Sequence, residues 1–348
     1  MFDIHAHLHD TAFDADRDEV VGRAFGAGVT KIITIGTDIV ESRKAVDCAE
    51  KYEGVYASVG IHPHEMNHLV KISNSKYQIS NQSHNDQINE WIRTLRELAR
   101  HPKVVAIGEC GLDYFVHQEA ESSEQRTKNS EQGTESSEQR AKNKEQRTRE
   151  IADAPLAVGQ LAETAVCDQP IISEEQKKIQ REGFIAQIDL AQELQLPLII
   201  HCRPSKGTVD AYEDVFEIFQ TSLVSQLPVT DYRLPIILHC YMGDTEVTEK
   251  FLTLPNVYFS FTGNITYPTK KVLVGTRNDL TEVVKMIPIE RILAETDCPY
   301  LAPVPHRGKR NEPAYVVSVV EKIAEIKGVS REVVEQTVAM SAKRIFGL

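Results

Sequence analysis

Short apolar runs recur along the chain and alternate with segments of helical periodicity. We expect strands at residues 3–8, 31–35, 55–60, 104–108, 196–201, 236–239, 257–261 and 292–295. Helical periodicity is seen at residues 18–25, 88–99, 184–194, 211–219, 314–326 and 331–345. Strands that alternate with helices form a parallel sheet. Eight such units predict an α/β fold, a single-domain (β/α)₈ TIM barrel.

A polar stretch in the middle of the chain explains part of its length, because 348 residues exceed the roughly 250 of such a barrel. The 14 residues from Glu121 are repeated in tandem through Thr148. In residues 121–150 the only apolar side chain is Ala141, and seven Glu balance seven Lys and Arg. Such a segment cannot offset the entropy of ordering its backbone. We therefore predict a disordered insertion within residues 115–176 of one domain spanning 1–348, and a smaller surface expansion near 71–89.

The net charge and the apolar runs exclude several classes of protein. A net charge of −12 disfavours broad electrostatic binding to nucleic acid or anionic membrane, so any nucleic-acid contact is expected to be local. No apolar run approaches the roughly 20 residues of a membrane span. The first residues lack the basic and apolar regions of a signal peptide. We expect a cytoplasmic protein without a membrane partner, and a monomer.

Polar side chains recur where the predicted strands end. His5 and His7 close the first run, and residues two apart on a strand face the same side. Six candidate ligands lie at five strand ends: His5, His7, Glu109, His201, His239 and Asp297. In a (β/α)₈ barrel, residues at the carboxyl ends of the strands converge on the active site. Four histidines and two carboxylates suit two divalent ions with a bridging carboxylate.

Four of the six cysteines directly follow these candidates: Cys110, Cys202, Cys240 and Cys298. Neighbouring strand residues face opposite ways, so we expect these thiols to point toward the helices as small hydrophobic groups. Cysteine ligands in a mixed zinc site are the competing interpretation.

Further polar residues follow the third, fifth and eighth runs. His62 and His64 follow the third run, and either can contact a phosphate, although His64 is equally compatible with an exposed structural role. Arg203 follows the fifth run, and Arg307 lies in a basic segment, residues 306–310, after the eighth. Cations here would bind phosphates, and the alternative is that they belong to a solvated loop.

Motifs at these positions occur in one order along the chain. They are Phe2-Asp-Ile-His5-Ala-His7, Gly60-Ile-His62-Pro-His64, Gly108-Glu109-Cys-Gly-Leu-Asp113-Tyr114, Ile200-His201-Cys-Arg203, Leu238-His239-Cys-Tyr241 and Glu295-Thr-Asp297-Cys-Pro-Tyr-Leu with Pro305-His306-Arg307-Gly308-Lys309. The set resembles the TatD family of metal-dependent deoxyribonucleases in the amidohydrolase superfamily. The resemblance covers the chain from end to end, apart from residues 115–176 and 71–89.

The resemblance implies a metal-dependent hydrolase of DNA phosphodiester bonds, a 3′–5′ exonuclease acting on single strands or 3′ ends. It implies one ion held by His5, His7 and Asp297, a second held by His201 and His239, and a bridge by Glu109. We expect Mg²⁺, with Mn²⁺ or Zn²⁺ as alternatives.

The resemblance also suggests catalytic and substrate-binding roles. Glu109 and Asp297 are the expected catalytic residues, with Asp297 orienting the attacking water or accepting its proton. His62, Arg203 and Arg307 are expected to contact phosphate oxygens.

Two other functions stay open at this point. A metal-activated water also attacks carbonyl groups, so a deacylase of aminoacylated tRNA is the main alternative. Many binuclear amidohydrolases carry a modified lysine at the end of the fourth strand, and Glu109 at that position favours the nuclease. A non-catalytic scaffold is the third possibility, and the presence of all six candidate ligands argues against it.

Overall fold

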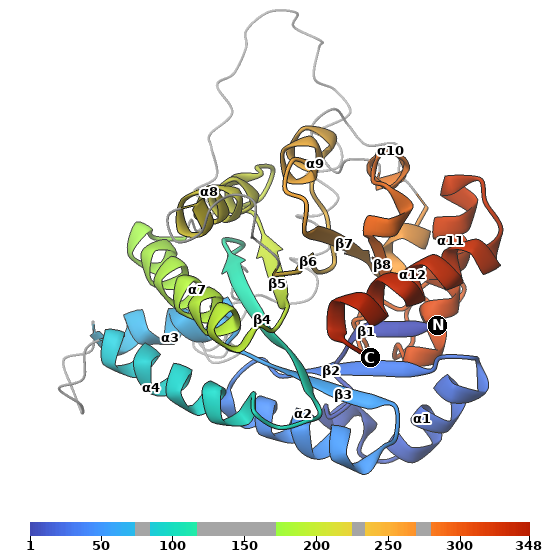
Figure 1. The fold of residues 1–348 in the computed structure, drawn as a ribbon, viewed down its shortest axis with the longest axis horizontal. Helices are drawn as coiled ribbons and strands as arrows, with labels where there is room; N and C mark the ends of the chain where they lie inside the picture. The colour runs from blue at the N-terminus through green and yellow to red at the C-terminus, as the bar shows by residue number, and fades with distance from the viewer. Residues whose placement is uncertain (74–83, 117–171, 225–233, 269–279) are drawn as a thin grey trace, which may run out of the picture. The chain divides into compact units, whose positions relative to one another are not determined.

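The computed structural model describes residues 1–73, 84–116, 172–224, 234–268 and 280–348. Met1–Phe115 and Ile172–Leu348 form one compact unit. Within it, eight strands build one sheet in which every neighbouring pair is parallel and the order follows the chain (Figure 1). The strands are β1 (Phe2–Ala6), β2 (Lys31–Ile35), β3 (Val55–Val59), β4 (Val104–Asp113), β5 (Leu198–Arg203), β6 (Ile236–Leu238), β7 (Val257–Phe261) and β8 (Ile292–Ala294).

The two ends of the sheet meet beside β1. Ala6 forms a parallel bridge with Cys298, which follows β8. The backbone N–H of His7 donates to the carbonyl of Cys298, and the N–H of Asp297 donates to the carbonyl of His5, both at 2.8 Å. These bonds nearly close the sheet, and the predicted (β/α)₈ barrel is confirmed.

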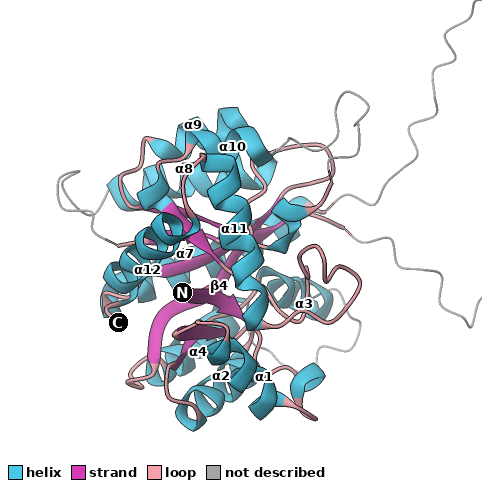
Figure 2. Ribbon diagram, turned by 90° about the vertical axis from the view of Figure 1, so that its right-hand side faces the viewer, coloured by secondary structure: helices cyan, strands magenta, loops and turns pink. Residues whose placement is uncertain are grey.

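Helices alternate with the strands along the chain. Figure 2 shows the helices in cyan around the magenta strands. They are α1 (Arg17–Gly26), α2 (Ile39–Lys51), α3 (Pro63–Ser73), α4 (His84–Leu98), α7 (Glu174–Leu194), α8 (Asp210–Val224), α9 (Thr245–Leu252), α10 (Leu280–Met286), α11 (Val316–Lys327) and α12 (Arg331–Phe346). Local sequence fixes several of their ends. The Asp38 carboxylate accepts from the N–H of Glu41 at the start of α2, and Gly328 ends α11 in the left-handed conformation.

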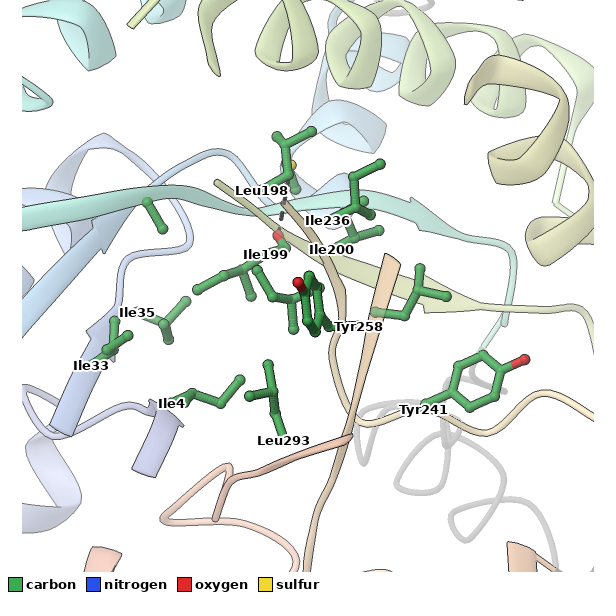
Figure 3. Packing of buried hydrophobic residues seen from close by; sticks show 14 of the residues in the cluster. Ile4, Ile33, Ile35, Leu198, Ile199, Ile200, Ile236, Tyr241, Tyr258 and Leu293 are labelled. Carbon is green, nitrogen blue, oxygen red and sulfur yellow. Dashed lines mark hydrogen bonds between the residues drawn. The ribbon is translucent and has the colours of Figure 1, made fainter. Parts of the chain in front are cut away.

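Buried apolar side chains from strands and helices form one continuous cluster. Figure 3 shows part of it, where Ile4, Ile35, Ile199 and Leu293 come from strands far apart in the sequence. Each of these four is fully buried. Burying such side chains contributes about 1.5–3 kcal/mol each, and the packed core provides a rigid base for the strand ends.

Two of the differences from the expected boundaries bear on the site and on the insertion. Strand β4 was predicted to end at residue 108, but it continues to Asp113 after a register irregularity between Ile107 and Cys110. This irregularity turns the strand without ending it, so Glu109 lies within β4. Helix α7 begins at Glu174, before the predicted end of the insertion at residue 176, because Ser173 and Gln176 form a capping box there.

The remainder of the predicted insertion, residues 117–171 with the tandem repeat, lies outside the described residues, as do residues 74–83 of the predicted expansion near 71–89. The rest of that expansion belongs to α3 and α4. In the part of the chain that the structure describes, no helix is long and apolar enough to span a bilayer.

Candidate metal centre

The Glu109 carboxylate lies at the centre of a group of imidazoles. Its Oε1 is 2.8 Å from Nδ1 of His201 and 3.2 Å from Nε2 of His239. Its Oε2 is 3.5 Å from Nε2 of His5, and the side chain is 5% exposed. Burial alone would raise the pKa of Glu109, but the histidines, His239 foremost, lower it well below the ordinary value. The centre therefore holds a buried carboxylate anion.

Neighbouring strands fix the backbone that carries Glu109. The N–H of Glu109 donates to the carbonyl of Gly36 at 3.0 Å, and the hydroxyl of Ser58 donates to the carbonyl of Gly108 at 2.6 Å. A Cβ atom on Gly60 would lie 2.6 Å from the carbonyl carbon of Gly108, so only glycine fits at this position. The carboxylate is thus held on rigid strands.

His5 and His7 both face Asp297, as their spacing on a strand predicts. Nε2 of His5 is 3.7 Å, and Nε2 of His7 is 3.4 Å, from Oδ1 of Asp297. The Asp297 side chain is 15% exposed and stands in the mouth of the barrel, at the turn that follows β8. One carboxylate oxygen is therefore shared between the two imidazoles.

Hydrogen bonds on the far side of the rings set the tautomers of His7 and His239. Nδ1–H of His7 donates to the carbonyl of Ile35 at 3.1 Å, and Nδ1–H of His239 donates to Oε1 of Glu295 at 3.1 Å. In each ring, Nε2 is then the nitrogen that faces the centre. Burial would lower the pKa of both histidines, but the neighbouring carboxylates raise it, so a metal ion bound at Nε2 would displace a proton. A ring nitrogen held in this way is the usual arrangement of a metal-binding histidine.

A carboxylate also orients His201, but in this ring Nε2 faces away from the centre and Nδ1 faces Glu109. Nε2–H of His201 donates to Oδ2 of Asp113 at 3.1 Å, and Nδ1–H donates to Oε1 of Glu109 at 2.8 Å. Burial would lower the pKa of His201, but these two carboxylates raise it to about 9, so a metal ion bound at Nδ1 would displace a proton. Nε2 of His64 lies 2.9 Å from the same oxygen of Asp113. The buried Asp113 carboxylate therefore orients His201 and also binds His64, which is 45% exposed.

His5 is the most unusual side chain of the group. It is fully buried, and neither of its ring nitrogens has a hydrogen-bond partner within the described residues. Its ring stacks on that of His239 with centroids 3.8 Å apart. A buried polar atom without a partner costs roughly 1–3 kcal/mol. A divalent ion on Nε2 would remove this cost, so the donor set fits the metal that its residue types predict.

His62 lies beside the group but presents a different nitrogen. Its Nδ1 accepts the backbone N–H of His64 at 3.2 Å, and burial, together with neighbouring His201, lowers the pKa of His62 to about 3. The neutral ring then carries its proton on Nε2, which lies 3.7 Å from Oε1 of Glu109. A protonated nitrogen donates hydrogen bonds and does not bind a metal.

The predicted phosphate-binding arginines stand on two sides of the barrel mouth. The Arg203 guanidinium, at the end of β5, stacks 4.0 Å over the ring of Phe115 beyond β4. The exposed Arg307 lies 4.3 Å over the ring of Tyr267, in the segments that follow β8 and β7. Each guanidinium stacks on an aromatic face, which helps to orient it.

The described cysteines stay outside the metal-binding groups. Cys110, Cys202 and Cys298 are buried, and burial raises the pKa of the Cys240 thiol to about 12. Every described group of metal-binding side chains consists of histidine and carboxylate alone. The site therefore contains no cysteine ligand within the described residues.

Two groups of side chains that could surround a metal ion share Glu109: one adds His5 and His7, and the other adds His62 and His201. Within each group the ligand atoms lie within 4.8 Å of one another, and in the second group His62 turns its protonated nitrogen toward Glu109. Glu295 and Asp113 were not among the predicted site residues, although both stand in the quoted motifs. Glu295 is fully buried, and its carboxylate also accepts from the N–H of Cys240 and the hydroxyl of Ser260. The sequence signal that could have identified these two residues is a carboxylate close to a predicted ligand: Glu295 lies near Asp297, and Asp113 lies near Glu109.

Comparison with known proteins agrees with this geometry. The family described as TatD related DNase matches residues 2–134 and 167–347. An uncharacterized metal-dependent hydrolase of Bacillus subtilis, YabD, is 32% identical over 346 residues, covering 99% of this chain and 98% of the relative. The 3′-5′ ssDNA/RNA exonuclease TatD of Escherichia coli K12 is 28% identical, with 100% and 99% covered.

Solved structures show the same fold. YJJV, a TatD homologue from Escherichia coli, superposes with a TM-score of 0.67 at 20% identity and covers 100% of this chain and 98% of its own. A TatD family hydrolase from Entamoeba histolytica gives 0.62 at 19% identity, with 99% and 97% covered. With the family matched across both halves of the barrel, this chain belongs to the TatD family of metal-dependent hydrolases.

Proposed function

We propose that this protein is a divalent-metal-dependent nuclease that removes nucleotides from the 3′ ends of single-stranded DNA. The observation that carries the proposal is the convergence of His5, His201 and His239 on the Glu109 carboxylate, with His7 and Asp297 beside them. The relatives named as ssDNA/RNA exonucleases, which align along nearly the whole chain, support the choice of substrate.

Two ions bridged by Glu109 are the arrangement that the ligand positions support best. Oε2 of Glu109 faces His5, whereas Oε1 faces His201 and His239. His5, His7 and Asp297 would hold one ion, and His201 and His239 the other. Divalent ions bound there would polarise the scissile phosphate and lower the pKa of a water molecule. We expect Mg²⁺ or Mn²⁺, and Zn²⁺ also suits these ligands.

Asp297 is the proposed proton acceptor. Burial would raise its pKa, but the hydrogen bond from His7 and the charge of His239 hold it below the ordinary value, so the side chain is a carboxylate at neutral pH. Its position at the barrel mouth lets it orient an attacking water and accept the proton.

His62 and the two arginines are proposed to bind the phosphate. Nε2–H of His62 is a neutral donor beside Glu109, which can hydrogen-bond a phosphate oxygen without competing for a metal. Arg203 and Arg307 supply local positive charge in a chain whose net charge is −12. Such a site suits a strand end better than a long duplex footprint.

A substrate panel tests the proposal. Purified protein loaded with Mg²⁺ or Mn²⁺ is assayed on 3′- and 5′-labelled single-stranded DNA, on duplex DNA and on an aminoacyl ester of tRNA. We expect chelator-sensitive release of nucleotides from the 3′ end of the single strand. Ester hydrolysis without DNA cleavage would contradict the proposal and assign the chain to the deacylases.

A further inference from the structure

Tyr300 is a large aromatic side chain left exposed at the barrel mouth. It is 57% exposed, whereas the other exposed aromatic side chain among the described residues, Phe25, is 37% exposed. The ring of Phe25 lies near Gly54, which precedes β3. Phe25 is therefore at the amino-terminal end of the strands, opposite the end that carries Tyr300. Tyr300 follows β8, and its ring centroid is 6.1 Å from that of His7 with the planes at 70°. An exposed aromatic ring therefore stands beside a candidate metal ligand.

The backbone that carries this ring is held firmly. The N–H of Tyr300 donates to the carbonyl of Asp297 at 2.9 Å. The side-chain amide of Asn311, which is fully buried, donates to the carbonyl of Tyr300 at 2.6 Å and to the carbonyl of Thr296 at 2.8 Å. The N–H of Asn311 also donates to the carbonyl of Pro299 at 3.0 Å. These bonds fix both sides of residue 300 to the strand end that carries Asp297.

Core packing does not explain the ring, because more than half of Tyr300 faces solvent. Exposed aromatic rings on a firmly held backbone serve nucleic-acid-binding proteins as stacking platforms, since every base has a π-face. A nucleobase is joined to its phosphate through one sugar. A base on Tyr300 would therefore place its phosphate close to His7 and Asp297.

We infer that Tyr300 is a binding platform on which the nucleobase next to the scissile phosphate stacks. This inference rests on the proposed nuclease function and extends it. The ring supplies affinity that does not depend on base identity, and it distinguishes a nucleotide end from a phosphodiester without a base.

Kinetics on two single-stranded oligonucleotides test the inference. One carries ordinary 3′-terminal nucleotides, and the other carries stable tetrahydrofuran abasic residues at its last two positions. Wild type is compared with Tyr300→Ala and Tyr300→Phe, and Phe25→Ala is the control for the loss of an exposed aromatic ring elsewhere. Bound metal is measured for each protein.

Tyr300→Ala should lower kcat/KM on the ordinary oligonucleotide by about 5- to 100-fold, mainly through KM. It should change cleavage of the abasic oligonucleotide less than twofold, because the base that it would contact is missing. Tyr300→Phe and Phe25→Ala should resemble wild type on both, with unchanged metal content.

Three results would overturn the inference: equal losses on both oligonucleotides, no loss on either, or a Phe variant as impaired as the Ala variant. The first would indicate a disturbed metal centre, and the last a role for the hydroxyl group. Failure of the metal-loaded wild type to cleave either oligonucleotide would instead contradict the proposed function itself.

Discussion

The Glu295 carboxylate accepts a hydrogen bond of 3.1 Å from Nδ1 of His239, across 56 residues of chain. This bond directs Nε2 toward Glu109, 3.2 Å away. Glu295 is itself fixed by Ser260 of β7 and by the N–H of Cys240. The orientation of His239 thus depends on Glu295, which lies on the opposite side of the ring from Glu109.

Replacing Glu295 with Gln should weaken metal binding. The amide keeps the size of the side chain but removes the charge that supports the His239 tautomer. Loss of such a partner typically lowers metal affinity 10- to 100-fold. Competition with a chromophoric chelator measures this change, and Glu249→Gln, on an exposed face of α9, is the matched control. An unchanged dissociation constant would refute this role of Glu295.

Divalent metal should stabilise the protein, because ligand binding to the folded state alone adds free energy of unfolding. At a concentration 100 times the dissociation constant the gain is about 2.7 kcal/mol. Thermal unfolding of the chelated protein, with and without added Mn²⁺, measures it, and Glu109→Ala should show a much smaller rise in Tm. Equal Tm values with and without metal would count against the metal centre.

The candidate ligands at the strand ends were predictable from the sequence, whereas the hydrogen-bond partners that orient them were not. His5 and His7 share a face because side chains alternate along any strand, and apolar runs place His201 and His239 at the same end of the barrel. The bonds from His239 to Glu295 and from His201 to Asp113 depend on how separate strands meet. No spacing within one segment encodes them.

Some helices and strand ends likewise could not be read from the sequence alone. Helix α2 was not among the segments singled out for helical periodicity, although Asp38 caps it and its buried residues include Ala45, Val46 and Ala49. The helix packs against β3, and tertiary packing of this kind supplies most of the stability of a helix in a protein. The extension of β4 beyond residue 108 likewise depends on pairing with β5.

Arg307→Ala should raise KM for DNA about three- to tenfold with little change in metal content. The side chain is exposed and stacks on Tyr267, so its loss removes a cation without opening the core. Because one phosphate contact is lost, the dependence of log affinity on log salt should fall by about 0.7. Lys343→Ala removes a cation from α12 as a control. Unchanged KM and salt dependence would instead support the interpretation that Arg307 belongs to a solvated loop and does not bind phosphate.

Deletion of residues 121–150 should leave folding and activity intact. The deleted residues carry balanced charge and a single apolar side chain, so from their composition we expect no contribution to the core. The flanking elements, β4 through Asp113 and α7 from Glu174, are complete without them. Thermal unfolding and the nuclease assay compare the deletion with the full chain. A fall in Tm of several degrees would assign the repeat a structural role.

The most direct test of the account is digestion of end-labelled single-stranded DNA by the purified protein and by Glu109→Ala, each with Mg²⁺ or Mn²⁺ and with a chelator control. Glu109 faces three of the proposed ligands, so its loss should abolish activity and reduce bound metal. The account predicts chelator-sensitive release of 3′ nucleotides by wild type and none by the variant. Near-normal turnover by Glu109→Ala, or no cleavage by the metal-loaded wild type, would contradict it.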